Sequence, residues 1–118
     1  MSDLLAVSGA RIFDGFDWHD HAALLVEFGH VAGVVPSDAI PAHAERIDLD
    51  GGCVVPGFID MQVNGGGGVL FNNDPSVSAI RTMLSAHAQF GTTALLPTLI
   101  TDTVEVNVAA MQAGREAA

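Results

Sequence analysis

The sequence predicts an α/β protein with two parts: a portion of a small β-sandwich over residues 1–55, and the start of a β/α series over residues 56–118. Short apolar runs separated by Gly, Asp and Pro fill the first part, which is typical of short strands and turns. The second part alternates strand-like runs with runs whose apolar residues recur at helical spacing. Of the 118 residues, 49% are hydrophobic, which is enough for a packed core.

Short strands are expected throughout the first part. Their ranges are Leu4–Ser8, Arg11–Phe13, Ala22–Phe28, Val31–Val35, Arg46–Leu49 and Cys53–Val55. Gly29 and His30 separate the third and fourth strands, which predicts a hairpin with a type II′ turn because that turn accepts Gly first. Cys53 is expected to be a small buried apolar residue.

Two strands and two helices are expected to alternate in the second part. The strands are Phe58–Val63 and the continuous apolar run Thr92–Ile100, whose pattern suits burial on both faces. The helices are expected to begin at Asn73 or Asp74, with Pro75 at the first position, and at Asp102. Their expected apolar faces are Val77, Ile80, Leu84 and Ala88 in the first helix, and Val104, Val108 and Met111 in the second.

The order β-α-β-α predicts parallel strands with helical crossovers. Two such units leave a very apolar strand as an open edge, whereas a closed β/α barrel needs eight units and about 250 residues. We therefore expect the sequence to be the N-terminal part of a longer protein.

The segment P-G-F-I-D-M-Q-V-N-G at residues 56–65 resembles the first barrel strand of the amidohydrolase superfamily, which usually reads P-G-x-x-D-x-H-x-H. Here Gln62 and Asn64 occupy the positions of the two metal-binding histidines. The Q-x-N version followed by four glycines, and the run G-T-T-A-L-L-P-T-L-I-T at residues 91–101, are similar to the N-acetylglucosamine-6-phosphate deacetylase family. This resemblance implies an amidohydrolase-type TIM barrel that begins at residue 56 and is incomplete within this sequence.

The resemblance also implies an activity for the longer protein. That activity is hydrolysis of N-acetylglucosamine 6-phosphate to glucosamine 6-phosphate and acetate in amino-sugar catabolism. One divalent metal ion, zinc or similar, would activate water, and its ligands would lie outside residues 1–118. The chain alone would then be inactive, with no catalytic residue and no metal ligand of its own. A homodimer is expected from the resemblance only.

Side-chain alternation gives the strand at 58–63 one polar face. Gln62 and Asn64 are expected to line the active site at the barrel mouth, because active sites occupy the carboxyl ends of barrel strands. Asp60 is a possible supporting carboxylate beside them. Gly65 and Gly66 begin the loop at the mouth; the run 65–68 either cradles a phosphate through N–H groups or, as we favour, meets a need for positive φ and close packing.

Histidines elsewhere in the sequence have structural explanations. His19 and His21, in the run D-W-H-D-H at 17–21, would share a strand face, but no further ligand lies nearby, so we interpret the run as a polar lead-in with Trp18 half buried. His30, His43 and His87 are expected to be solvated or packed.

Charge and cysteine content exclude several classes of function. The chain has 4 basic and 14 acidic residues, a net charge of -10, without the cationic surface that nucleic acids or anionic membranes require. A single cysteine excludes an internal disulfide framework and a cysteine-based zinc site. The N-terminus lacks a basic leader and no apolar run would span a membrane, so a cytoplasmic location is expected.

Two other functions remain open on the sequence alone. One is a different amidohydrolase-superfamily hydrolase, dihydroorotase-like or imidazolonepropionase-like, which the missing His-x-His disfavours. The other is a non-enzymatic β-rich oligomeric module, in which a second copy covers the run 92–100.

Overall fold

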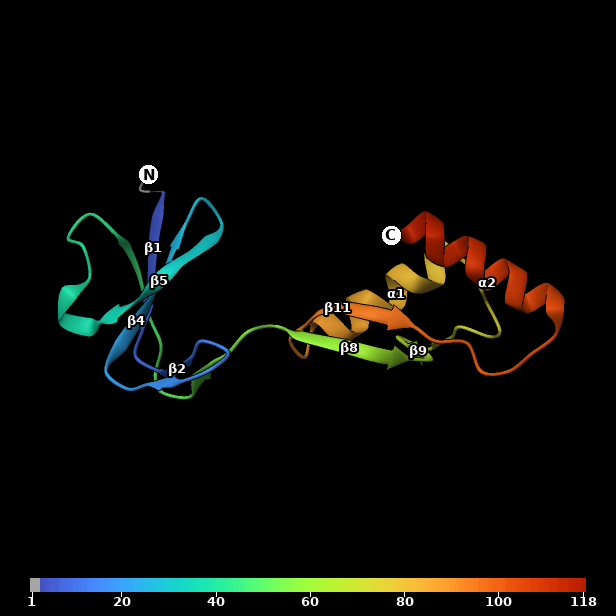
Figure 1. The fold of residues 1–118 in the computed structure, drawn as a ribbon, viewed down its shortest axis with the longest axis horizontal. Coiled ribbons are helices and arrows are strands. Elements are labelled where there is room, and N and C mark those ends of the chain that lie inside the picture. Colours follow the sequence, from blue (N-terminus) through green and yellow to red (C-terminus); the bar gives the residue numbers. More distant parts are fainter. Residues whose placement is uncertain (1–2) are drawn as a thin grey trace. The chain divides into compact units, whose positions relative to one another are not determined.

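The computed structural model describes residues 3–118, which divide into two compact units, Met1–Pro56 and Gly57–Ala118 (Figure 1). The first unit is almost entirely β-structure. Its elements are β1 (Leu4–Ser8), β2 (Arg11–Phe13), β3 (Trp18–His19), β4 (Ala22–Glu27), β5 (His30–Pro36), the 3₁₀ turn Ser37–Ala39, β6 (Glu45–Asp48) and β7 (Cys53–Val54). The six predicted strands are thus present, and no end differs from its predicted position by more than one residue; the short strand β3 was not predicted.

Two mixed sheets make up the first unit. One has the strand order β5-β4-β1-β6 and the other the order β3-β2-β7. β1 pairs antiparallel with β4 and parallel with β6, and β2 pairs antiparallel with β3 and parallel with β7. Side chains from both sheets contribute to the small core, which contains Ala6, Ile12, Ala22, Ala23 and Ala44. Cys53 is exposed, so the prediction that it is buried was wrong.

The hairpin between β4 and β5 turns one residue earlier than predicted. Glu27 pairs with His30, which leaves Phe28 and Gly29 as the two turn residues. Both have positive φ, 49° and 79°, as a type I′ turn requires and a type II′ turn does not. Gly29 serves as the second central residue, and His30 is already part of the strand.

The second unit contains the predicted β-α-β-α order with a small additional hairpin. Its elements are β8 (Phe58–Val63), β9 (Gly65–Gly66), β10 (Val69–Leu70), α1 (Val77–Ala88), β11 (Thr92–Pro97) and α2 (Val104–Ala117). β8 and β11 are parallel neighbours, which confirms the predicted pairing (Figure 1). β11 ends at Pro97, three residues earlier than predicted.

Both helices begin one or more residues later than predicted. Ser76 caps α1, its hydroxyl accepting a hydrogen bond from the N–H of Ala79 at 3.1 Å, so Pro75 precedes the cap. Thr103 caps α2 in the same way, through the N–H of Val106. Asp102 does not cap α2 because its carboxylate binds other groups, described below.

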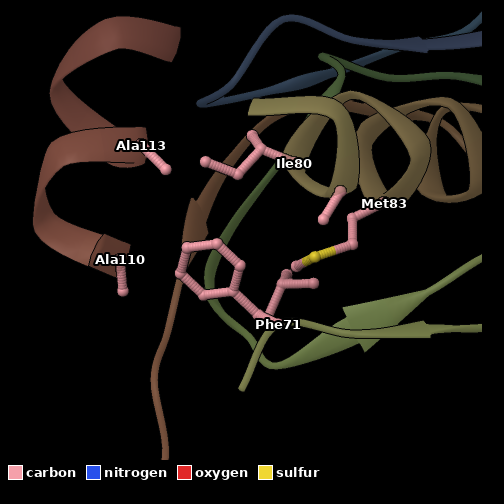
Figure 2. Close-up of a cluster of buried hydrophobic side chains, with 7 residues drawn as sticks. Phe71, Ile80, Met83, Ala110 and Ala113 are labelled. Carbon is pink, nitrogen blue, oxygen red and sulfur yellow. The ribbon is translucent and has the colours of Figure 1, made fainter. Parts of the chain in front are cut away.

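A compact apolar cluster holds α1 and α2 beside the strands. Its buried members are Val63, Phe71, Ala79, Ile80, Met83, Ala110 and Ala113. In Figure 2 the ring of Phe71 lies among Ile80 and Met83 of α1 and Ala110 of α2. The packing faces of the helices are therefore built mainly from alanines, with Ile80 and Met83.

The predicted apolar faces were largely wrong. Of the four residues expected in α1, Ile80 is buried and Val77 packs against the same cluster while partly buried, whereas Leu84 and Ala88 are exposed. In α2, Val104, Val108 and Met111 are 73%, 48% and 59% exposed, because the helix turns its alanines toward Phe71. The run 92–100 is not buried on both faces within this chain, since Leu96 and Ile100 are more than half exposed. No helix within residues 3–118 is long and apolar enough to cross a membrane.

Candidate active-site residues

A row of polar side chains leads to the carboxyl end of β8. Val63 packs into the apolar cluster, so strand alternation directs its neighbours Gln62 and Asn64, and Asp60 with them, to the opposite side. Asp60 and Asn64 are half-buried and Gln62 is exposed. The burial of Val63 is thus consistent with the prediction that these three polar residues share the other side of the strand end.

Asn64 is held on two sides. Its Nδ2 donates to the carbonyl of Thr98 at 2.9 Å, and its own carbonyl accepts from the N–H of Phe71 at 2.8 Å. The Oδ1 atom has no hydrogen-bond partner among residues 3–118. A rigidly held amide with a spare acceptor is suited to binding a donor group of a ligand.

Asp60 acts on its own strand. Its Oδ1 accepts from the N–H of Gln62 at 3.1 Å, which fixes the backbone that carries Gln62. The Gln62 side chain makes no hydrogen bond within the described part of the chain, so both ends of its amide are available to a ligand.

The glycine run after Asn64 forms a tight hairpin rather than an open loop. β9 and β10 pair through Gly66 with Val69 and Gly65 with Leu70. A Cβ on Gly65 would overlap the carbonyl oxygen of Val69, and a Cβ on Gly66 would lie 2.9 Å from His87 Nε2. The turn residues 67 and 68 have φ of 63° and 83°. Close packing at Gly65 and Gly66 and positive φ at 67 and 68 agree with the interpretation that we favour.

His87, near the end of α1, reaches this hairpin. Its Nε2 donates to the carbonyl of Gly65 at 3.0 Å. The sequence indicated only a solvated or packed histidine, and the structure shows a packed one with a specific partner.

Asn72 and Thr98 are site residues that sequence reasoning missed. Asn72 lies 28 residues from its partner Ile100, whose N–H donates to its Oδ1 at 2.9 Å and whose carbonyl accepts from its Nδ2 at 2.8 Å. The same Nδ2 donates to Asp102 Oδ2 at 2.8 Å. Hydrogen bonds from Asn72 and from the N–H of Thr103 lower the pKa of Asp102. A pattern of neighbouring residues in the sequence cannot predict a contact between residues 28 positions apart.

The run 17–21 in the first unit forms a polar surface cluster. Asp14 accepts from His19 Nε2 and from the N–H groups of Phe16 and Asp17, all at 2.8 Å. These bonds, the Asp17 N–H above all and then His19, lower the pKa of Asp14 to about 2. Arg11 pairs with Asp20 at 2.7 Å.

The aromatic part of this cluster agrees with the predicted lead-in. Trp18 is 47% exposed, lies under the guanidinium of Arg11 at 4.8 Å and contacts the ring of Phe13. His21 has a φ of 53° and follows the strand pair rather than sharing a ladder face with His19. Within residues 3–118 no group of three or more His, Cys, Asp or Glu side chains could hold a metal ion.

Comparison with known proteins identifies related sequences and structures. Residues 5–54 match the family model described as the NagA composite domain. The chain is 42% identical, over 97% of its length, to N-acetylgalactosamine-6-phosphate deacetylase of Shewanella sp. (strain ANA-3), and 33% identical, over 81%, to N-acetylglucosamine-6-phosphate deacetylase of Haemophilus influenzae. It spans 29% and 25% of the lengths of these relatives.

A solved structure extends the similarity to the whole described fold. The crystal structure of N-acetylglucosamine-6-phosphate deacetylase from Pasteurella multocida superposes with a TM-score of 0.89 and 36% sequence identity. The match covers 97% of this chain and 30% of that one. Both units, including the parallel pair β8–β11, thus have counterparts within a longer protein.

Proposed function

The chain belongs to the N-acetylglucosamine-6-phosphate deacetylase family, and on this basis we propose that it forms the first part of a longer enzyme that removes the acetyl group from an N-acetylhexosamine 6-phosphate. The products would be a hexosamine 6-phosphate and acetate. The observation that carries this proposal is similarity at 42% identity over 97% of the chain, with Gln62 and Asn64 at the strand end where a barrel would have its active site.

In this proposal β8 and β11 are the first two strands of an amidohydrolase-type TIM barrel. Their parallel pairing and the helices that follow each of them support that assignment. The domain division at residues 1–55 and 56–118 belongs to the same proposal. Exposed apolar side chains on both strands, such as Ile59 and Leu96, suit a sheet that further strands and helices would cover.

Gln62 and Asn64 would line the substrate site. The unpartnered amide of Gln62 and the spare Oδ1 of Asn64 can bind polar groups of the sugar or its acetamide, or a water molecule. Asp60 would keep Gln62 in place through the backbone hydrogen bond. Gly65 and Gly66 would shape the mouth by letting the hairpin pack closely against His87.

The described residues do not fit a metal site. Neutral amide oxygens are poor ligands for zinc-like ions, and the nearby carboxylates of Asp60 and Asp102 are engaged in hydrogen bonds. Any divalent ion would be held by residues outside this chain. When bound, such an ion supplies activated water and polarises the amide carbonyl.

The experiment is an acetate-release assay on the longer protein with N-acetylglucosamine 6-phosphate and N-acetylgalactosamine 6-phosphate, since the two relatives differ in the named sugar. Gln62→Leu and Asn64→Leu should each lower kcat/KM by about tenfold or more, the value of one lost hydrogen bond to substrate. Gln112→Leu, on the exposed side of α2, is the matched control and should leave activity unchanged. Absence of acetate release from both sugars would refute the proposed activity.

A further inference from the structure

The chain that follows β11 is held by side chains rather than by a strand. Backbone pairing with β8 ends after Pro97, and the last such bond runs from the N–H of Thr98 to the carbonyl of Val63 at 2.8 Å. Beyond it, the segment 98–102 lies next to the chain that follows β8.

Two asparagines continue the pairing. Asn64 donates to the carbonyl of Thr98, and Asn72 pairs with both backbone groups of Ile100, as a neighbouring strand would. The amides thus contact alternate residues of the segment, 98 and 100. A side-chain amide has the same donor and acceptor as a peptide group, which explains why it can replace a strand here.

Asn72 is well placed to fix this segment because its own backbone is fixed. The preceding residue, Phe71, is 2% exposed in the apolar cluster, and its N–H binds the carbonyl of Asn64. Asn72 also binds the carboxylate of Asp102, so its Oδ1 and Nδ2 are both occupied. Asn64 and Asn72 are therefore connected twice, through Phe71 and through the segment 98–100.

We propose that Asn72 is a positioning residue for the deacetylase site: by holding Ile100 and Asp102, it keeps the Thr98 carbonyl where Asn64 Nδ2 binds it. This orientation leaves Asn64 Oδ1 as the acceptor that meets substrate, so Asn64 selects a hydroxyl or N–H donor there. The inference rests on the proposed function for its reaction, but the coupling between Asn72 and Asn64 can be measured without it.

The test compares Asn72→Ala with Asn73→Ala in the longer protein. Asn73 is the matched control, since its side chain is exposed and makes no hydrogen bond within residues 3–118. The first readout is the side-chain amide resonance of Asn64 in a ¹H–¹⁵N spectrum. The chemical shift of this resonance and its protection from solvent exchange should both change in Asn72→Ala. In Asn73→Ala both should equal the values of the unsubstituted protein.

The second readout is a double-mutant cycle on kcat/KM. Asn72→Ala should lower kcat/KM about tenfold by itself and less than about twofold in an Asn64→Ala background, because a residue that acts through Asn64 has no effect without it. Full additivity would overturn the proposal, since it is what a general loss of stability produces.

The two proposals fail in distinguishable ways. If the unsubstituted protein releases no acetate from either sugar, the proposed activity is wrong, and the Asn64 resonance alone then decides whether Asn72 positions Asn64. An Asn64 signal that is the same in Asn72→Ala and Asn73→Ala overturns the inference even in an active enzyme.

Discussion

Alanine substitutions at three glycines test whether close packing explains the run after Asn64. A Cβ on Gly65 would meet backbone atoms of the same hairpin, overlapping the Val69 carbonyl oxygen and lying 3.3 Å from Leu70 Cα. Neither atom can move without opening β9 from β10. A Cβ on Gly68, with φ of 83°, or on Gly114 in α2 meets nothing within 4 Å.

The three sites therefore predict three magnitudes. Gly65→Ala should destabilise the second unit by about 3 kcal/mol, through overlap and loss of the His87 hydrogen bond. Gly68→Ala should lower the free energy of unfolding by about 1–2 kcal/mol, because alanine is strained in the left-handed backbone conformation but meets no other atom there. Gly114→Ala should stabilise by about 1 kcal/mol, because it replaces a helical glycine in open space.

Urea unfolding measures these differences. Both α-helices lie in the unit Gly57–Ala118, so helical circular dichroism reports on that unit, and the fluorescence of Trp18 reports on the other. The Trp18 transition should stay constant across the series. If the free energy of unfolding of Gly65→Ala lies within about 1 kcal/mol of the value for the unsubstituted chain, the steric explanation is refuted. Stabilisation by inorganic phosphate that Gly68→Ala abolishes would favour a phosphate cradle instead.

Two further predictions concern the core of the second unit and the polar cluster of the first. Phe71→Ala should lower the free energy of unfolding in urea by about 3–5 kcal/mol, because Phe71 is buried. Phe16→Ala, at a residue 91% exposed, should change it by less than about 0.5 kcal/mol. Equal effects of the two substitutions would contradict the assigned core. Asp14 should titrate at about pH 2 in an NMR titration, and since its pKa is lowered, its contribution to stability is present above pH 3.8 and lost as pH falls through about 2. Asp14→Asn should remove the loss of stability that protonation of Asp14 causes in acid. A titration midpoint for Asp14 near 3.8 would contradict the hydrogen bonds described for it.

Local patterns predicted the strands well because alternation and turn residues act over a few positions. Leu4–Ser8 and Phe58–Val63 have the predicted bounds. Helix starts were less certain, since cap-competent residues lie close together. Ser76 caps α1 although Asp74 is two residues away, and Thr103 caps α2 because Asn72 binds Asp102.

The candidate site was predictable only in part. Alternation along β8 grouped Gln62 with Asn64 and Asp60, and their shared role in a site remains a prediction. The partners that hold Asn64, namely Thr98 and Phe71, come from distant positions and depend on the pairing of β8 with β11. The sequence also did not predict that α2 packs through Ala110 and Ala113. A search for helical periodicity gives most weight to the larger apolar residues, and in α2 these lie away from the core.

The order of strand partners in the first unit has a consequence for synthesis on the ribosome. β1 and β2 each have one antiparallel partner nearby and one parallel partner far along the chain, as in the pair Ser8 with Asp48. The hairpin β4–β5 can form early, but neither sheet is complete until residues 45–54 have left the exit tunnel. A nascent chain arrested before Glu45 would carry both β1 and β2 as open edges, where chaperones would be expected to bind.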